Sequence, residues 1–334
     1  MSAAAVTASA SVRPPAFDVG VPVRLPARAD GRRMHTLSAS SYELWQQCEE
    51  RWRRRYLLGE REPPSPAMML GTAVDRALGW MYERRIEGEL PERGDVLVAY
   101  ARLYEENERD RRSAVWTAAE PEQLIRAWGL RCVEVFLDRI APLVGRAVSV
   151  QRELTLKLND ACEWKIRGYV DLETIRDEPV AVTDHGLVLA IDAAPPKDHT
   201  VVTRCEAGEP IVTDYKVKSR YITRQEADGD LQAGLYLLDR RLRGDPAGGF
   251  VFANLIKPGG RRAAIDGRLL LTTRTERQMR GVLDRFAQMA SEITARVEQF
   301  GFERPWKFAD PRQSFPCRQR FCAYAQRCPG WSGL

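Results

Sequence analysis

The sequence predicts a mixed α/β (α+β) protein, in which one main domain holds a mixed central sheet flanked by helices. Three observations support this prediction. Helical patterns fill the chain up to about residue 145, and alternating strand patterns begin near residue 147. Strands and helices then follow one another up to about residue 300, where a cysteine-bearing tail begins. With 334 residues, of which 44% are apolar, the chain is long enough to bury a sizeable core.

The first part of the chain is predicted to be an arm followed by helices. Residues 1–35 are rich in Ala, Ser, Pro and Arg and lack apolar periodicity, which is typical of a disordered arm. A helix is predicted in "LSASSYELWQQCEERWRRRYLLG", where Ser40 and Glu43 have the spacing of a capping box. "EPPSP" ends this helix, and "MLGTAVDRALGWMYERR" and two stretches around 93–110 and 120–140 are predicted to be helical as well.

The later part of the chain is predicted to hold the sheet. "AVSVQRELTLKL" and "CEWKIRGYVDLETI" alternate like two strands of a hairpin that turns at Asn159–Asp160. Residues 177–208 are expected to be an irregular or short-stranded insertion. The strand "IVTDYKVKS", a helix over about 224–242, the strand "GGFVFANLI" and a strand near 267–272 follow. A long helix comes next, after the capping-box pattern "TRTE".

The charge balance permits a nucleic-acid partner, and the apolar pattern gives no membrane span. The net charge is +5, which is mildly basic. No run approaches 18 consecutive apolar residues. Met1 is followed by no secretory pattern, and the seven cysteines have no secretory context. We therefore expect a cytoplasmic protein of a prokaryotic or phage-infected cell, without a disulfide framework.

One short stretch carries an unusual pair of charges. In "IVTDYKVKS", a strand would place Asp214 and Lys216 on the same face, since they are two residues apart. Burying both charges is unfavourable unless they pair or bind something. Only seven of the 51 basic residues are lysines, so a lysine at this position indicates a need for a compact ammonium group. We expect a bound ion and a phosphate, rather than a private ion pair, to balance these charges.

Acidic residues on the two preceding strands make this stretch a candidate metal site. Glu153 and Asp171 lie on predicted strands that neighbour the strand of Asp214, and adjacent strands are about 5 Å apart. Carboxylates at matching heights could share Mg²⁺ or Mn²⁺, and such an ion can activate water for attack on a phosphodiester. Lys216 would then stabilise the charge that develops on the phosphate. The alternative is a set of solvated carboxylates with a surface ion pair of little consequence.

Two helical segments carry candidate DNA contacts. In "DLQAGLYLLDRRL", Gln232, Tyr236 and Arg240 follow one another at one-turn spacing and form a polar stripe that suits a phosphate backbone. Arg53 and Arg54, in "ERWRRRY", are candidates for tracking single-stranded DNA by phosphate contact beside aromatic rings. In both segments the alternative is an ordinary solvated helix face.

The cysteines suggest a second metal site. Cys317, Cys322 and Cys328 lie within twelve residues, and Cys48 on the first predicted helix is the candidate fourth ligand. Four thiolates can hold either zinc or an iron–sulfur cluster, and the spacing does not separate these two occupants.

Taken in order, these residues resemble a known family. Gly168-Tyr169-Val170-Asp171, then Asp214-Tyr215-Lys216, then Gln232-x-x-x-Tyr236 are similar to the ordered motifs of PD-(D/E)XK nucleases. The most similar branch is the RecB-like one, with the CRISPR-associated RecB-like exonucleases and their phage relatives. That branch carries a metal-binding histidine in a Gly-Thr-x-x-His setting. Here Gly71 and Thr72 are followed by Asp75, which departs from the pattern and is still an oxygen ligand suited to Mg²⁺ or Mn²⁺. The alternative is that Asp75 is an exposed helix residue.

The resemblance implies a role for each motif residue. Asp75, Asp171, Asp214 and the carbonyl of Tyr215 would bind Mg²⁺ or Mn²⁺. Glu153 would support this shell, Lys216 would act at the reacting phosphate, and Gln232 and Tyr236 would align the strand.

The resemblance also implies a domain plan and an occupant for the cysteines. Residues 36–145 would be a helical region with the first cluster cysteine, 146–300 a restriction-endonuclease-like nuclease core, and 301–334 a cysteine segment packed on the core. Iron–sulfur members of the branch take one cysteine from an N-terminal helix and three from the C-terminal end. The four cysteines would therefore hold a [4Fe-4S] cluster that joins the two ends of the domain, with zinc as the less favoured occupant.

The predicted function is that of a metal-dependent DNA nuclease. We expect an exonuclease that hydrolyses phosphodiester bonds in single-stranded DNA or at DNA ends, in recombination, repair, phage replication or CRISPR-type DNA processing. A helicase, recombinase or integrase is the expected protein partner, and the oligomeric state is left open. The alternative is a non-catalytic DNA-binding or recombination-accessory protein with the same fold and cluster, since Asp75 departs from the family pattern and the 177–208 insertion is long.

Overall fold

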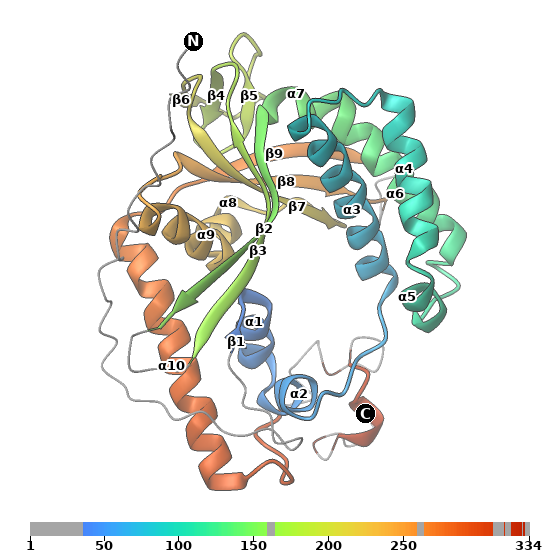
Figure 1. Ribbon diagram of the computed structural model, residues 1–334, viewed down its shortest axis with the longest axis vertical. Coiled ribbons are helices and arrows are strands. Elements are labelled where there is room, and N and C mark those ends of the chain that lie inside the picture. Colours follow the sequence, from blue (N-terminus) through green and yellow to red (C-terminus); the bar gives the residue numbers. More distant parts are fainter. Residues whose placement is uncertain are drawn as a thin grey trace, which may run out of the picture.

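The computed structural model describes residues 36–158, 164–258, 264–309, 317, 322–328 and 330 (Figure 1). The predicted arm at residues 1–35 and the predicted turn at Asn159–Asp160 lie outside these residues. Within the described ranges, no helix is both long enough and apolar enough to cross a bilayer.

The main sheet is mixed, as the sequence predicted. Its strand order is β1 (Thr36–Leu37), β3 (Lys165–Ile175), β7 (Pro210–Lys218), β8 (Gly249–Ile256) and β9 (Asp266–Thr272), with β2 (Arg146–Lys157) paired to β3. The pairs β1–β3 and β7–β8 are parallel, and the other pairs are antiparallel. Every residue of β8 is buried, which is typical of a central strand covered on both faces.

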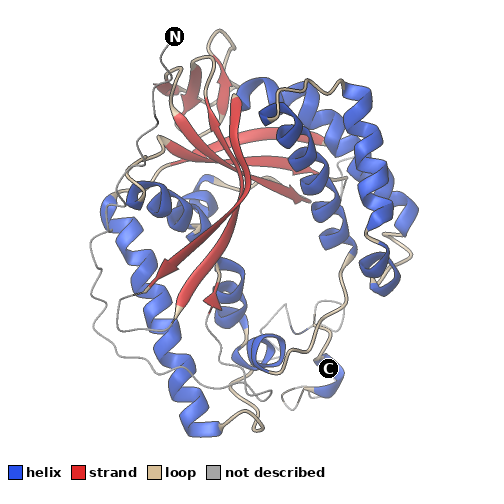
Figure 2. Ribbon diagram, in the orientation of Figure 1, coloured by secondary structure: helices blue, strands red, loops and turns tan. Residues whose placement is uncertain are grey.

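Helices cover both faces of this sheet, and each face has its own core (Figure 2). Alternate residues of β8 divide between the two: Phe250 and Phe252 enter the first core, and Val251 and Ala253 enter the second. The first core contains α1 (Ala39–Gln47), α9 (Leu231–Leu242) and α10 (Glu276–Phe300). The second core contains α3 (Pro66–Ile86), α4 (Arg93–Glu106) and α6 (Glu122–Val135). The observed arrangement confirms the predicted fold class.

Short elements complete the chain. They are α2 (Glu49–Trp52), the π-helical turn η1 (Arg53–Leu57), α5 (Glu108–Ser113), the π-helical turn η2 (Phe136–Ile140), α7 (Ala141–Val144), α8 (Arg224–Gly229) and the 3₁₀ turn η4 (Ala325–Arg327). The predicted insertion at 177–208 forms a small antiparallel sheet of its own, in the order β5 (Val188–Ala190), β4 (Val180–Thr183), β6 (Val201–Cys205). A bridge between Leu187 and Leu270 joins this sheet to β9.

Both predicted capping boxes are displaced by two residues. The sequence predicted Ser40 with Glu43 and Thr273 with Glu276, and the structure has Ser38 with Ser41 and Thr275 with Gln278. The cap is the last residue with extended backbone, and that position depends on where the preceding strand ends. Several Ser and Thr residues stand before each helix, so the spacing rule alone chose the wrong one.

The first predicted helix is interrupted at Cys48. This residue has extended backbone, with φ −166° and ψ 111°, and it ends α1 and begins α2. Its sulfur accepts a hydrogen bond from the backbone N–H of Arg51 at 3.4 Å. The break turns the chain so that α2 lies beside the C-terminal segment (Figure 1), where the N–H of Glu50 bonds to the carbonyl of Lys307 at 3.0 Å.

Candidate active site

The candidate site lies where two strands of the main sheet separate. Strands β3 and β7 share four residue pairs, of which the last joins Leu172 to Thr213. Beyond this pair, β3 continues beside β2 and β7 continues beside β8. Asp171 and Asp214 are the first residues past the point of separation, which we call the fork. Since the fork ends the ladder between the two strands, the Tyr215 N–H donates instead to Oδ2 of Asp171, at 3.0 Å.

At the fork, β2 and β3 both rotate about their own axes, so that the same alternating set of side chains changes from one face of the sheet to the other. On β3, Val170 packs into the first core and Leu172 into the second, although alternate residues of a regular strand share a face. On β2, Leu154 packs into the first core and Val150 packs against the second. The reversal on β2 coincides with Gln151, which has φ 46°. A left-handed conformation in a non-glycine residue costs on the order of 1 kcal/mol and is often found at functional sites.

Gln151 connects helix α3 to the fork. It stands opposite Asp171, because the flanking residues of the two strands are paired with each other. Its side-chain amide donates to both oxygens of Asp75, at 3.1 and 3.3 Å. The left-handed turn of β2 thus directs a neutral donor toward α3, and this donor orients Asp75 without cancelling its charge.

The three aspartates of the site affect one another electrostatically. Burial and the charge of Asp214 raise the pKa of Asp75 to about 6. Burial and the charges of Asp214 and Asp75 raise the pKa of Asp171 well above its ordinary value. Carboxylates that disfavour one another's ionised form are typical of sites that accept a cation.

Lys216 faces the same fork from β7. Its Nζ lies 2.7 Å from Oδ2 of Asp214 and 3.3 Å from Oε1 of Gln232. Burial alone would lower the pKa of Lys216, but the neighbouring Asp214 carboxylate outweighs burial and raises it. Lys216 therefore stays an ammonium ion. Asp214 and Lys216 are paired directly, and Gln232 contacts both side chains, so the pair is not a private one. That an ion and a phosphate balance these charges stays a prediction.

Helix α9 supplies a hydrogen-bonded chain that holds this pair. Gln232 donates to Oδ1 of Asp214 at 2.7 Å and to the hydroxyl of Tyr236 at 3.2 Å. The Tyr236 hydroxyl donates in turn to the backbone carbonyl of Tyr169 at 2.6 Å. Tyr236 comes so near to β3 that a Cβ at Gly168 would lie 2.9 Å from its ring. The glycine of the Gly-x-x-Asp motif is therefore needed for close packing of α9 against β3.

The donor set suits a divalent cation, although its atoms do not form a closed coordination shell. Among the described residues, no group of three His, Cys, Asp or Glu side chains is arranged to hold a metal ion. Each carboxylate is held by a different neighbour: Asp75 by Gln151, Asp171 by a backbone N–H, and Asp214 by Lys216 and Gln232. Burial, together with mutual repulsion, raises the pKa values of Asp75 and Asp171, and a bound Mg²⁺ or Mn²⁺ would relieve the repulsion. The use of the Tyr215 carbonyl as a further ligand stays a prediction.

Glu153 does not join this group. Its carboxylate lies on an exposed part of β2 and pairs with Arg167 at 2.8 Å, where both side chains are 46% exposed. The residue of β2 that reaches the site is Gln151, which lies two residues before Glu153 and nearer the fork. Sequence reasoning missed Gln151 because a glutamine in an alternating strand gives no signal of a left-handed turn.

Two of the three predicted DNA-contacting arginines are buried. Arg53 is 3% exposed and pairs with Glu50 at 2.7 Å. Arg240 is 4% exposed and pairs with Glu173 at 3.3 Å. Each guanidinium is buried against a carboxylate instead of facing solvent, where a phosphate could contact it, so the structure contradicts both assignments.

Arg54 is more exposed but is also held in place. It donates to Glu50 at 2.9 Å, and its guanidinium lies 5.5 Å from the centre of the Tyr324 ring. These contacts join α2 and η1 to the C-terminal segment, which supports a structural role rather than DNA contact.

One further acidic residue, Asp230, interacts electrostatically with Lys216. Asp230 caps α9 by accepting a hydrogen bond from the Ala233 N–H at 2.8 Å. Burial raises the pKa of Asp230, while the charge of Lys216 lowers it. The break between α8 and α9 at this position was not predicted, although Asp before a helix is a common capping signal.

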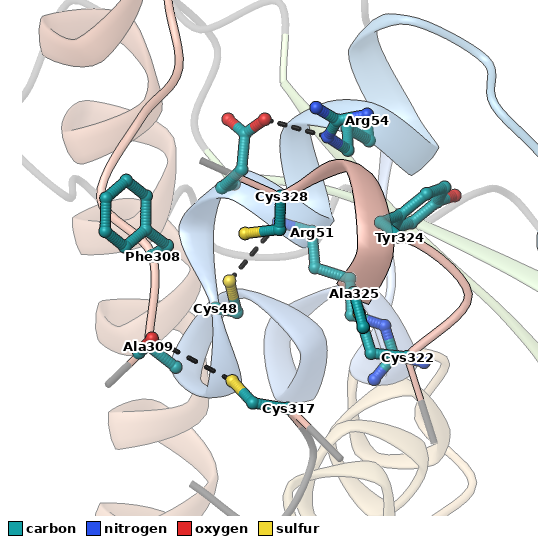
Figure 3. Close-up of a pocket in the computed structure, with 11 residues that line it drawn as sticks. Cys48, Arg51, Arg54, Phe308, Ala309, Cys317, Cys322, Tyr324, Ala325 and Cys328 are labelled. Carbon is teal, nitrogen blue, oxygen red and sulfur yellow. Dashed lines mark hydrogen bonds and ion pairs between the residues drawn. The ribbon is translucent and has the colours of Figure 1, made fainter. Parts of the chain in front are cut away.

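The four predicted cluster cysteines line one pocket (Figure 3). They are Cys48 from the junction of α1 and α2, and Cys317, Cys322 and Cys328 from the C-terminal segment. Burial raises the pKa of Cys48, and the neighbouring thiols Cys317 and Cys328 raise it further. The tertiary structure therefore brings together thiols that are up to 280 residues apart in sequence, although no three described thiols have metal-holding geometry as they stand.

Comparisons with known proteins found a family model and solved structures that are similar to this chain. Residues 36–185 match the model of the PD-(D/E)XK nuclease superfamily, a range that contains Asp75 and Asp171. A crystal structure named "Putative exonuclease" from Eubacterium rectale has a TM-score of 0.46 and 14% identity, covering 82% of this chain and 84% of that one. The crystal structure of SSO0001 has a TM-score of 0.30 and 11% identity, covering 81% of this chain and 88% of that one. No curated protein matches the sequence. Residues 36–185 are thus similar to the PD-(D/E)XK nuclease superfamily, and the mixed sheet with helices on both faces is consistent with the fold of that superfamily.

Proposed function

We propose that this protein is a metal-dependent deoxyribonuclease of the RecB-like iron–sulfur branch, and that it degrades single-stranded DNA or DNA ends as an exonuclease. One observation carries the proposal. Asp171, Asp214 and the half-buried ammonium ion of Lys216 lie at the fork of β3 and β7, and Gln151 links Asp75 to it. Helix α9 holds Asp214 and Lys216 through Gln232 and Tyr236.

Asp75, Asp171 and Asp214 are the residues that would hold the metal. PD-(D/E)XK nucleases generally use divalent metals. A bound Mg²⁺ or Mn²⁺ polarises a phosphoryl oxygen and lowers the pKa of a coordinated water. The carbonyl of Tyr215 is an additional candidate ligand, because Tyr215 lies between Asp214 and Lys216 and its N–H already bonds to Asp171.

The protein's own groups supply orientation and charge. Lys216 stays protonated because of Asp214, so its role is to stabilise negative charge on the phosphate rather than to accept a proton. Gln232 fixes the direction of both side chains, since it donates to Asp214 and accepts from Lys216. Gln151 orients Asp75 and is a positioning residue for the metal.

The cysteine pocket is proposed to hold a [4Fe-4S] cluster with a structural role. Its four thiols come from both ends of the described chain, and none of the residues that line it (Figure 3) belongs to the fork. A cluster here would link α1 and α2 to the C-terminal segment. A cytoplasmic role in recombination, repair, phage replication or CRISPR-type DNA processing, with a helicase, recombinase or integrase partner, completes the proposal.

The nuclease proposal is tested with end-labelled single-stranded and duplex DNA in the presence of Mg²⁺ or Mn²⁺. We expect degradation by the wild type, with product sizes that report the direction of digestion. Asp214→Asn and Lys216→Ala should each lower the rate by at least about 10²-fold. Lys257→Ala is a matched control, since Lys257 is an ion-paired lysine that bonds to Glu120 instead of a fork residue. If the wild type binds DNA but cleaves none with any metal, the non-catalytic DNA-binding function replaces this proposal.

A further inference from the structure

The strands β2 and β3 extend past the fork as a ribbon (Figure 2), and β1 pairs with β3 at the far end of this ribbon, at Lys165 and Ile166. One face of this ribbon is buried in the first core through residues such as Leu154, Ile166 and Val170. The opposite face is exposed and carries a row of polar and aromatic side chains. We call this the ribbon row, and its members are Glu153, Thr155 and Lys157 on β2 and Lys165, Arg167 and Tyr169 on β3.

The far end of the ribbon row carries two lysines that face each other. Lys157 and Lys165 are direct partners in the antiparallel register, and both are exposed. Like charges directly opposite on a sheet are destabilising. Among the described residues, no carboxylate forms an ion pair with either lysine, so no described group offsets this repulsion. An anion bound across the ribbon would offset it.

The near end of the ribbon row carries an aromatic ring beside the fork. Tyr169 is 45% exposed, and the guanidinium of Arg167 lies 5.1 Å from the centre of its ring. Its backbone carbonyl accepts the hydrogen bond from Tyr236, so the strand is held in place, while its hydroxyl bonds to the exposed side chains of Arg167 and Glu153. Tyr169 precedes Asp171 by two residues on β3, so along the strand the ribbon row ends next to the candidate active site.

We propose that the ribbon row is a track for single-stranded DNA that leads into the fork. This inference rests on the proposed nuclease function, because that function is the reason for the bound DNA to lead toward the fork. The cations at Lys157, Lys165 and Arg167 suit phosphates, and the exposed ring of Tyr169 suits stacking on an unpaired base. From Lys165 to Asp171 a strand rises about 20 Å, which is long enough for several nucleotides. A duplex hides the faces of its bases, so stacking on Tyr169 favours a single strand.

Glu153 is the one anion of the ribbon row. Its removal should therefore change DNA affinity in the opposite direction to removal of the lysines. Its ion pair with Arg167 joins two side chains that are each 46% exposed, and such surface pairs are weak. A phosphate can therefore replace Glu153 as the partner of Arg167. Removing the charge of Glu153 should improve DNA binding, whereas removing the charges of the lysines should weaken it.

The proposal is tested by fluorescence anisotropy with a labelled single-stranded oligonucleotide and the full chain, in EDTA to prevent cleavage. We expect Tyr169→Ala to weaken binding by roughly tenfold and Tyr169→Phe to retain it, because phenylalanine still stacks. The double change Lys157→Gln with Lys165→Gln should weaken binding and reduce the slope of log K against log salt by about 1.4, which corresponds to two phosphate contacts on a single strand. Glu153→Gln should tighten binding by roughly twofold or more.

Lys197→Gln is the matched control, since Lys197 is an exposed lysine of the 177–208 insertion. It should change neither the affinity nor the salt slope. The proposal is overturned if the two-lysine variant keeps the wild-type salt slope, if Tyr169→Ala binds as well as Tyr169→Phe, or if duplex DNA binds as tightly and with the same sensitivities.

Cleavage of the same strands in Mn²⁺ separates this inference from the nuclease proposal. If the wild type cleaves nothing while the ribbon-row variants lose binding as described, the track is supported and the nuclease proposal fails. If the wild type cleaves while every ribbon-row variant binds normally, the nuclease proposal stands and the track is disproved.

Discussion

At the scale of single residues, Lys216 illustrates how composition and geometry agree. The chain uses arginine for most of its basic positions, yet a lysine lies between Asp214 and Gln232 at the fork. A guanidinium is planar and larger than an ammonium, so it cannot keep both contacts in the same space. We expect Lys216→Arg to lower the nuclease rate by at least about 10²-fold while leaving the thermal midpoint close to that of the wild type. Retention of the wild-type rate by Lys216→Arg would contradict the role of a compact cation.

Gln151 gives a prediction that separates stability from metal binding. Gln151→Gly removes the amide that holds Asp75 and also relieves the left-handed backbone at φ 46°. We therefore expect the variant to be at least as stable as the wild type and to bind Mn²⁺ about 10- to 100-fold more weakly. Isothermal titration with Mn²⁺ and urea denaturation measure the two effects separately. Unchanged Mn²⁺ affinity would show that Asp75 needs no positioning residue.

Gly168 is predicted to be intolerant of even one added carbon. A Cβ at this position would lie 2.9 Å from the ring of Tyr236, and the hydroxyl of that ring is held at both Gln232 and Tyr169. We expect Gly168→Ala to destabilise the fold by about 1–3 kcal/mol, as overpacking commonly does, and to slow cleavage because α9 is pushed away from β3. Gly281→Ala on α10 is a control, because nothing lies within 4 Å of an added Cβ there.

At the scale of elements, a buried ion cluster joins α9 to the strands beside the fork. Glu173 of β3 is its centre, and its carboxylate accepts from Arg152 at 2.8 Å, Arg243 at 2.8 Å and Arg240 at 3.3 Å. Its side chain is only 2% exposed. Removing one partner of such a cluster leaves buried charges uncompensated, so Glu173→Ala should cost about 3–5 kcal/mol of unfolding free energy.

The same cluster predicts a dependence of stability on pH. Burial would raise the pKa of Glu173, but hydrogen bonds from Arg152 and Ser149 outweigh burial and lower it from 4.5 to about 2. A carboxyl with a lower pKa in the folded state stabilises the fold above its unfolded pKa, and this contribution is lost as the pH falls through the folded value. We expect the difference in unfolding free energy between wild type and Glu173→Gln to be constant above about pH 5 and to shrink between about pH 4 and pH 2. A difference that is independent of pH would contradict the assigned shift.

At the scale of the whole molecule, the C-terminal segment is tied to the first helices. The indole rings of Trp52 and Trp306 are stacked with centroids 6.2 Å apart, and Trp45 meets Trp52 edge to face at 5.3 Å. The backbone N–H of Trp306 donates to the carboxylate of Glu50 at 2.9 Å. This aromatic contact and the cysteine pocket both close the chain between its described ends, so a cluster in that pocket would add to a contact that already exists.

The cluster proposal predicts a coloured, iron-dependent protein. We expect anaerobically purified protein to absorb visible light and to contain iron and acid-labile sulfide in equal amounts. Cys322→Ser should remove both signals and lower the thermal midpoint, since the pocket loses one of its four thiols. Cys205→Ala should keep them, because Cys205 is a buried cysteine of β6 outside the pocket. A colourless protein that contains zinc would refute the iron–sulfur assignment.

The parts that the sequence predicted well are those with a local signal. Apolar runs and alternation predicted the positions of β7, β8 and the hairpin of β2 and β3, because burial on one or two faces leaves a pattern along the strand. Short motifs identified Asp171, Asp214, Lys216, Gln232 and Tyr236, which the structure brings to the fork. Their chemical roles stay predictions.

The parts that the sequence did not predict depend on partners far along the chain. Arg53 bonds to the carbonyl of Phe302, and Arg240 bonds to Glu173. Because these partners are far away in the sequence, the residues next to each arginine do not predict that it is buried. The capping boxes were misplaced because the end of the preceding strand, rather than the local spacing, selects the N-cap. Glu153 was chosen over Gln151 because a charged residue is a stronger signal than an amide.

The sequence by itself determined the fold class, the order of strands and helices, and the residue types able to bind a cation and stabilise charge on a phosphate. Only the tertiary structure decided which of them meet. The fork exists because β3 and β7 stop pairing after Leu172 and Thr213, and the reversal at Gln151 turns β2 and β3 toward α3. Both features depend on how the strands pack against the two cores. The order of residues along the chain does not predict where two strands stop pairing.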